Sequence, residues 1–222
     1  MAPTPLARVA LALAAALAAA AGARAADTEV RDFATRIDGK PAGDYHMTIT
    51  RGDDGTCTMS GQADVRLTRL GITVYRYSYN GTEVWKGGRL VKFNSQSNDD
   101  GKPFTVAAWA EGDRLRVRAN GQEQVARGDA WVTTYWQLPA RDLRNGAVPL
   151  IEADNGQILN GQMQYLGSEQ LTVGGRVQNC THYRASGPNL TELWFDAQER
   201  LVKREWTEDG HRVVIELVRV RK

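Results

Sequence analysis

The sequence predicts an all-β protein, a curved antiparallel meander that forms an open or partly closed β-barrel. Three observations support this fold class: turn dipeptides recur at short spacing, the runs between them alternate apolar and polar residues, and helical periodicity is almost absent. Asn-Gly and Asp-Gly are strong hairpin signals because both central residues of a type I′ turn need positive φ. Strands that recur about every ten residues are typical of sandwiches, barrels and meanders.

The first 25 residues are excluded from this fold because they have the pattern of a secretory signal peptide. Arg8 supplies a positive n-region, an Ala-rich apolar run follows, and Ala23-Arg24-Ala25 fits a small-x-small cleavage site. We expect cleavage after Ala25 and export to a bacterial periplasm. The apolar run is short for a membrane span, and no cysteine follows it to carry a lipid. We therefore expect no stable membrane anchor.

The mature chain, residues 26–222, is expected to be a single β-rich domain without net charge. It has 222 − 25 = 197 residues, enough for one sizeable core, and no Pro/Ser-rich linker divides it. The leader contains Arg8 and Arg24 and no acids, so 28 − 2 = 26 Lys and Arg face 26 Asp and Glu. Neutrality removes the main electrostatic argument for nucleic-acid binding and for a general attraction to anionic membranes.

Turn signals divide the mature chain into the expected strands. In chain order they are Asp38-Gly39, Asp53-Asp54-Gly55, Lys86-Gly87-Gly88, Asp100-Gly101, Glu111-Gly112-Asp113, Asn120-Gly121, Asn155-Gly156, Asn160-Gly161, Gly174-Gly175 and Asp209-Gly210. Between them, residues 45–50 and 114–119 alternate apolar and polar side chains, the pattern of a strand with one buried face, and Val213, Ile215 and Leu217 line one face of the last strand. Each of these runs is predicted to be one strand of the meander.

One stretch, residues 128–145, breaks the alternation. It contains DAWVTTYWQLPARDLRN, and we expect a short helical plug around Pro139–Leu143. A long insertion of this kind can form a lid over one opening of a sheet. Trp131 and Trp136 lie in it, and both a ligand gate and a plug that fills the core are consistent with them.

The chain repeats one short pattern. Residues 82–92 are TEVWKGGRLVK, residues 191–203 are TELWFDAQERLVK, and both continue to an Asp-Gly turn. Each copy is predicted to be a three-stranded meander unit, with its Glu and Trp on one face and the aliphatic residue between them on the other. Common strand-and-turn patterns explain the repeat more simply than duplication of a half-sheet, although both remain open.

Several segments of the mature chain carry recognisable motifs: GITVYRYSYNGTEVWKGGRLVKFNSQSNDDGK, TTYWQLPARDL, YLGSEQLTVGG, HYRASGP and ELWFDAQERLVKREWTEDG. Together they resemble an uncharacterised family of exported bacterial proteins, a domain of unknown function. The resemblance implies no activity. The C-terminal half is also similar to exported families whose sheets curl into an open half-barrel, like bacterial lipoprotein carriers, which is an analogy of fold alone.

Aromatic residues are the candidate ligand-binding residues. Tyr75, Tyr77 and Tyr79 alternate along one strand, and Glu83 and Trp85 continue the same face unless Asn80-Gly81 forms a bulge. The further candidates are Trp109, Trp131, Trp136 and Trp194. A concave sheet lined by such side chains could hold an apolar ligand. The alternative, aromatic pairs that fill a β core, is the more common use of these residues.

The two cysteines, Cys57 and Cys180, could form a disulfide in an oxidising compartment. In the chain-entropy model such a long-loop disulfide would contribute about 4–5 kcal/mol. Two separate buried thiols are the alternative, because a sequence does not report the Cα separation that a disulfide requires.

Residues that could carry catalysis or bind a metal form no recognised motif. The repeat relates Glu83 to Glu192, and paired carboxylates are the acid and base of glycosidases. A Glu on a strand more often faces solvent or an arginine across the ladder, here Arg89 or Arg200. His182 lies two residues from Cys180, but the histidines lack metal-ligand spacing, and nucleotide-binding and serine-hydrolase motifs are absent from the sequence. We expect no metal and no cofactor.

Three functions remain, in this order. The first is a periplasmic protein that binds or carries a lipid or other apolar ligand in a curved β-sheet. The second is a structural or interaction module of the envelope, which would use an exposed sheet edge or an aromatic patch. The third is a hydrolase that uses Glu83, Glu192 or His182, which would need two carboxylates about 5–9 Å apart. The sequence indicates no oligomeric state.

Overall fold

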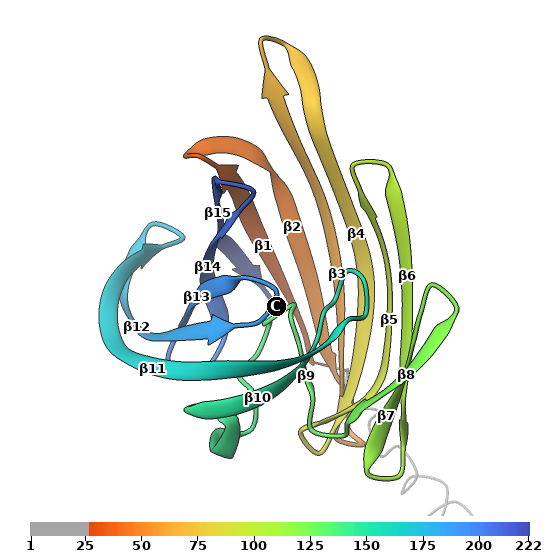
Figure 1. Cartoon of the computed structure of the whole chain (residues 1–222). Helices are drawn as coiled ribbons and strands as arrows, with labels where there is room; N and C mark the ends of the chain where they lie inside the picture. The colour runs from red at the N-terminus through yellow and green to blue at the C-terminus, as the bar shows by residue number, and fades with distance from the viewer. Residues whose placement is uncertain (1–26) are drawn as a thin grey trace, which may run out of the picture.

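The computed structural model describes residues 27–222, which form one 15-stranded sheet (Figure 1). The predicted signal peptide and its cleavage after Ala25 lie outside the described residues. The predicted fold class, an antiparallel meander curved into an open barrel, is confirmed. The strands are β1 (Asp27–Ile37), β2 (Lys40–Arg51), β3 (Thr56–Arg69), β4 (Ile72–Lys86), β5 (Arg89–Asp99), β6 (Lys102–Glu111), β7 (Arg114–Ala119), β8 (Gln122–Arg127), β9 (Trp131–Val132), β10 (Gly146–Ile151), β11 (Ile158–Val173), β12 (Arg176–Ser186), β13 (Leu190–Phe195), β14 (Leu201–Glu208) and β15 (His211–Arg221).

The two ends of the described chain meet in the middle of the sheet. β1 pairs with β15, and two meanders run outward from this seam, β1 to β8 on one side and β15 to β10 on the other. β9 pairs with β10 as the parallel pair at one edge, and β8 forms the other edge. Because the two edge strands do not pair, the barrel stays open.

Most turn predictions are confirmed, and one is wrong. Asp38, Asp100, Asn120 and Asp209 each begin a two-residue turn with positive φ, as the Asp-Gly and Asn-Gly signals predict. Asn160-Gly161 instead lies inside β11. A Cβ at Gly161 would come within 2.4 Å of the Ser186 carbonyl oxygen, so this glycine permits close packing of two strands and makes no turn.

The inside of the curved sheet is filled by an extended segment, and the helix contributes little. The predicted helical plug is a three-residue 3₁₀ helix, Arg141–Leu143. Residues 130–136, which include β9, are all buried, and all but Thr133 and Thr134 belong to the main hydrophobic core with Phe33, Met47, Phe93 and Leu193. An apolar segment with no free face does not need helical periodicity, which is why its alternation breaks.

The repeated pattern forms two equivalent hairpins of the sheet, whose Glu and Trp side chains point to opposite faces. TEVW lies in β4 and TELW in β13, and each is followed by the strand that contains Leu-Val-Lys. Glu83 and Trp85 point inward and are buried, whereas Thr191 and Leu193 are the inward residues of β13. Glu192 and Trp194 therefore lie on the outer face. Glu and Trp share a face in each unit, as predicted, but the face differs.

The disulfide alternative for Cys57 and Cys180 is not formed, and both cysteines are free thiols. They lie on β3 and β12, with β2, β1, β15, β14 and β13 between them in the sheet. Burial raises the pKa of both thiols, which makes them poor nucleophiles. Between residues 27 and 222, no helix is long and apolar enough to cross a membrane.

Candidate functional site

A cavity of about 300 Å³ opens at one end of the curved sheet. It lies where β1, β3, β5, β12 and β14 end and where β4, β6, β13 and β15 begin, as its lining residues show. The wall combines apolar side chains, such as Ile37, Val65 and Ile215, with tyrosines and charged groups. A concave site with mixed lining at the mouth of a β-barrel is a common place for ligand binding.

Tyrosines form one side of the cavity. Tyr75, Tyr77 and Tyr79 all line it, joined by Tyr45 from β2. The ring of Tyr79 meets that of Tyr45 edge-on, with 6.4 Å between centroids. The predicted bulge at Asn80-Gly81 is not formed: β3 and β4 stay in register there, with Gly61 opposite Gly81.

This glycine pair makes room for the tyrosine rings. A Cβ at Gly61 would lie 2.8 Å from the Tyr45 hydroxyl oxygen, and a Cβ at Gly81 would overlap the Tyr79 hydroxyl. The hydroxyl end of each ring therefore lies against a glycine, in space that a Cβ would occupy. In Asn80-Gly81 the glycine therefore makes room for the Tyr79 ring and does not form a turn.

The floor of the cavity is formed by the inner segment and by the β10–β11 turn. The Thr133 hydroxyl accepts a hydrogen bond from the Ala153 N–H at 2.9 Å. Ser95 and Ser97 of β5 donate their hydroxyl hydrogens to the carbonyl oxygens of Ala153 and Asp154, at 2.6 and 3.0 Å. These bonds fix two irregular segments to each other and to the sheet, so the floor is held in one conformation.

Charged groups gather on the same wall, and most are acidic. Asp99, Glu152, Asp154 and Glu208 line the cavity, against one cation, Arg204, among the lining residues. Burial raises the pKa of the Asp154 carboxyl above its usual value, although Tyr77 donates a hydrogen bond to it and Arg204 lies nearby. Burial likewise raises the pKa of Glu152. The cavity thus favours groups that donate hydrogen bonds or carry positive charge.

The sequence does not single out these acids. Glu152 and Asp154 belong to a stretch, EADNG, whose Asn155-Gly156 predicts only a turn. Arg204 lies on β14 in the consecutive polar run Lys203-Arg204-Glu205, which resembles an exposed segment. The fold makes them functional candidates because it turns both segments toward the same interior.

Polar atoms without partners mark this wall. Among residues 27–222, four buried side-chain polar atoms lack a hydrogen-bond partner: Thr35 Oγ1, Tyr79 OH, Tyr135 OH and Arg204 Nε. The residues Thr35, Tyr79 and Arg204 all line the cavity. Buried polar groups are nearly always hydrogen-bonded in proteins, so each exception requires an explanation.

Substitution of Asp154 by Asn is expected to reduce the pH dependence of stability. A carboxyl with a raised pKa binds more protons in the folded than in the unfolded chain. The free energy of unfolding of the native protein therefore falls as the pH rises above the unfolded pKa of about 3.9. Asn keeps an acceptor for Tyr77 and does not titrate.

Urea unfolding at about pH 4 and about pH 7 tests this prediction, since it gives the free energy of unfolding at each pH. The free energy of unfolding of Asp154→Asn, relative to that of the native protein, should be larger at about pH 7 than at about pH 4. Equal differences at both values would contradict the raised pKa. Glu152 is present in both proteins, so the comparison isolates Asp154.

The predicted ligand-binding residues fall into three groups. Tyr75, Tyr77 and Tyr79 line the cavity. Trp85, Trp131 and Trp136 are buried in the hydrophobic core and are not among the lining residues. Trp109 is partly exposed and lies under Arg118, whereas Trp194 is 6% exposed, belongs to the same core cluster and lies under Lys203. Neither lines the cavity. The structure therefore brings three of the eight candidates to the cavity.

Glu83 organises the core beneath the cavity. Its carboxyl is fully buried and accepts hydrogen bonds from Trp85 Nε1 (2.7 Å), Trp136 Nε1 (2.9 Å) and the Thr134 hydroxyl (2.6 Å). Burial raises the pKa of this carboxyl in spite of the three donors. Glu83 therefore faces neither solvent nor Arg89, the alternatives considered for it, and its bonds tie the inner segment to β4.

Glu83 and Glu192 do not form the carboxylate pair that the hydrolase hypothesis requires. Glu83 is inside the sheet, whereas Glu192 lies outside it and pairs with Arg184 (2.6 Å) and His182 (2.7 Å). His182 stacks on Trp194, with 4.3 Å between ring centroids. The two glutamates therefore cannot act on one substrate. Among the described residues, no group of His, Cys, Asp and Glu is arranged to hold a metal ion.

Comparisons with known proteins agree with this fold. The family model described as a domain of unknown function (DUF6134) matches residues 33–218. A similar solved structure is the crystal structure of a beta-barrel-like protein of domain of unknown function DUF1849 from Brucella abortus. It aligns with a TM-score of 0.63 and 8% identity over 88% of this chain and 97% of that chain, a likeness of fold alone. No curated protein matches the chain.

Proposed function

The chain belongs to the DUF6134 family of domains of unknown function, and we propose from its cavity that it binds a lipid or another amphipathic small ligand. The observation that carries the proposal is the coincidence of the cavity with Thr35 Oγ1, Tyr79 OH and Arg204 Nε, which are buried and without partners. A ligand whose polar group reached one of these atoms would supply its missing partner, and burial of the apolar part would supply most of the affinity.

The lining defines the chemistry of this ligand. Its apolar part would pack against Tyr45, Tyr79, Val65 and Ile215. Its polar part would be uncharged or cationic, because four carboxyl groups and one guanidinium line the wall and a carboxylate head would meet like charges. A volume of about 300 Å³ lies at the lower end of the range for ligand pockets, so only part of a long acyl chain would fit inside.

The double substitution Tyr79→Phe/Thr35→Val tests the proposal with an uncharged probe, N-phenyl-1-naphthylamine. The probe becomes fluorescent in apolar surroundings, and its N–H can donate to a tyrosine or threonine oxygen. We expect saturable binding to the native protein and about fivefold weaker binding to the double variant, because one hydrogen bond of about 1 kcal/mol is lost whichever of the two oxygens accepts it.

Tyr135→Phe is the matched control. It also removes a buried hydroxyl without a partner, but Tyr135 is not among the lining residues. The control should bind the probe like the native protein and should be equally stable or more stable, because no hydrogen bond is lost. Equal binding by all three proteins, or no saturable binding to any of them, would contradict the proposal.

The proposal includes export to the periplasm. It is supported by the leader pattern of residues 1–25, which combines Arg8, an Ala-rich run and the Ala23-Arg24-Ala25 site. Expression of the full chain in a bacterium, followed by cell fractionation and N-terminal sequencing, should find a periplasmic form that begins at Ala26. Uncleaved protein in the cytoplasm would contradict export.

A further inference from the structure

The β3–β4 hairpin projects beyond the rest of the sheet at the mouth of the cavity (Figure 1). Its tip carries three large aliphatic side chains that face solvent: Leu70 (102% exposed), Ile72 (68%) and Val74 (47%). Tyr75 follows directly on β4 and lines the cavity. Single exposed aliphatic residues are ordinary, but a projecting cluster of them is typical of an interaction surface.

Leu70 is unfavourable for the hairpin itself. It begins the two-residue turn and has φ = 52°, in the left-handed region that is costly for a residue with a bulky side chain. The equivalent residues of four other two-residue turns are Asp38, Asp100, Asn120 and Asp209, which adopt this conformation more readily. A fully exposed leucine at this position gains no burial that would offset the strain. The stability of the hairpin therefore does not explain why a leucine occupies this position.

The charges of the hairpin are basic. Residues 66–76 contain Arg66, Arg69 and Arg76 and no acidic residue. Asp64, just below the tip, lies 3.0 Å from Arg66 and 3.5 Å from Arg76. Arg69 lies 3.5 Å from His211, which pairs with Asp38 at 2.7 Å. Three guanidinium groups against two carboxylates leave a small positive charge at the tip, even though the mature chain is neutral as a whole. Aliphatic residues beside arginines are the combination that binds the interface of an anionic membrane.

We propose that the tip of the β3–β4 hairpin docks on anionic phospholipid bilayers, with Leu70, Ile72 and Val74 inserted at the interface and the arginines on phosphate groups. Arg69 pairs with Ile72 directly across the hairpin, so a basic and an aliphatic side chain lie side by side at its tip. The apolar and the basic groups can therefore meet one surface together. Docking would bring the cavity mouth close to the bilayer.

Vesicle flotation tests this proposal without any cavity ligand. The native protein should float with vesicles of phosphatidylcholine and phosphatidylglycerol, much less with phosphatidylcholine alone, and less as salt is added. The triple variant Leu70→Asn/Ile72→Thr/Val74→Thr should bind about tenfold more weakly, because it loses the apolar surface that would leave water.

Two controls make the result specific. Val177→Asn changes a residue on β12 that is as exposed as Ile72, 68% in both cases, and should leave vesicle binding unchanged. Leu70→Asn alone should melt at the same or a higher temperature, since Asn tolerates the left-handed turn, and should still weaken binding. Together they separate a lost docking surface from a damaged fold.

Three outcomes would overturn the proposal. The native protein could stay with the unbound fraction at low salt, or the triple variant could bind like the native protein. The third is a dimer in sedimentation velocity that Leu70→Asn dissolves while vesicle binding is absent, because the hairpin would then contact a second copy of this chain.

Discussion

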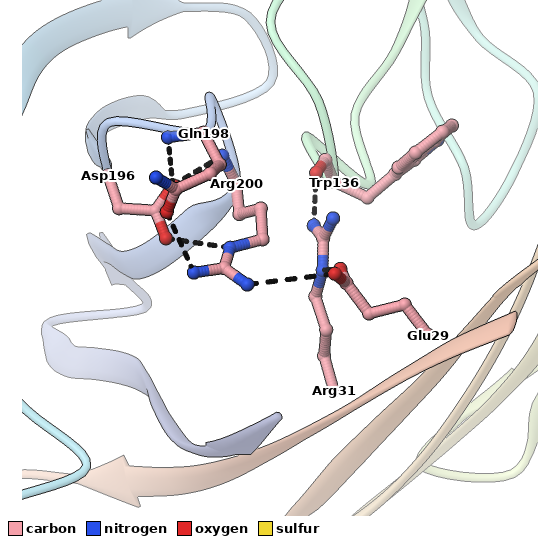
Figure 2. A network of polar contacts seen from close by, with 6 residues as sticks. All are labelled: Glu29, Arg31, Trp136, Asp196, Gln198 and Arg200. Atoms are coloured by element: carbon pink, nitrogen blue, oxygen red, sulfur yellow. Dashed lines mark hydrogen bonds and ion pairs between the residues drawn. The ribbon is translucent and has the colours of Figure 1, made fainter. Parts of the chain in front are cut away.

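Replacement of Arg31 by Met is expected to lower the free energy of unfolding by about 3–5 kcal/mol, because it leaves a buried carboxylate poorly compensated. The Arg31 side chain is 2% exposed and that of Glu29 is 6% exposed, and Arg31 Nε lies 2.7 Å from Glu29 Oε1. The other donor, Nη1, bonds to the carbonyl oxygen of Trp136 at 2.8 Å (Figure 2). Methionine fills similar space but provides neither bond.

The network explains why the loss should be large. Arg200 lies 3.6 Å from the second oxygen of Glu29 and 2.7 Å from Asp196, within the turn that joins β13 to β14 (Figure 2). Burial alone would raise the pKa of Glu29, but Arg31 and Arg200 hold it below its usual value. The network thus connects β1, the inner segment and the β13–β14 turn through paired charges.

A double-mutant cycle in chemical denaturation measures this interaction. Glu29→Gln/Arg31→Met removes both charges and should recover a large part of the stability lost in Arg31→Met alone. The native protein should have a larger free energy of unfolding than Glu29→Gln at neutral pH. This difference should shrink as the pH falls below about 4.3, the pKa of a glutamate in the unfolded chain, and should be lost once Glu29 is protonated in the folded chain as well. Additive effects of the two substitutions would contradict the network.

Replacement of Glu83 by Ala is expected to cost about 3–5 kcal/mol, because three buried donors lose their acceptor at once. These are the indole N–H groups of Trp85 and Trp136 and the hydroxyl of Thr134. Glu83→Gln should cost about 1–3 kcal/mol, since one carbonyl oxygen remains and the new amide hydrogens face other donors. Guanidinium unfolding curves give both values.

Glu192→Ala is the matched control because it alters the second copy of the repeated pattern. Glu192 lies on the outer face, its side chain is 22% exposed, and it pairs with Arg184 and His182. Its loss should cost about 1 kcal/mol or less, as for other surface ion pairs. Similar losses for Glu83→Ala and Glu192→Ala would contradict the assignment of the two glutamates to opposite faces.

The sequence predicts the fold well because β-hairpins are local. Asp38-Gly39, Asp100-Gly101 and Asp209-Gly210 need positive φ wherever they occur, so each turn can be recognised from the dipeptide. Asn160-Gly161 shows the limit of this argument. The same dipeptide can serve close packing, and only the neighbouring strand, with Ser186 against Gly161, decides between the two.

The candidate site was predictable only on its tyrosine side. The period-two pattern of Tyr75, Tyr77 and Tyr79 places the three rings on one face, and the sheet turns this face inward. Asp154 and Arg204 reach the same cavity from segments about fifty residues apart, which no local pattern can show. The opposite faces of Glu83 and Glu192 depend on how each hairpin joins the curved sheet, which the repeat does not encode.

Native mass spectrometry of the mature protein, purified without detergent from bacterial periplasm, tests the central claim most directly. Ligand binding in the cavity predicts a stoichiometric adduct on the native protein and on Tyr135→Phe, which is diminished or absent on Tyr79→Phe/Thr35→Val. Extraction and fragmentation of the adduct would identify an uncharged or cationic amphiphile. The native protein at the mass of the bare chain, both as purified and after incubation with an envelope lipid extract, would contradict it.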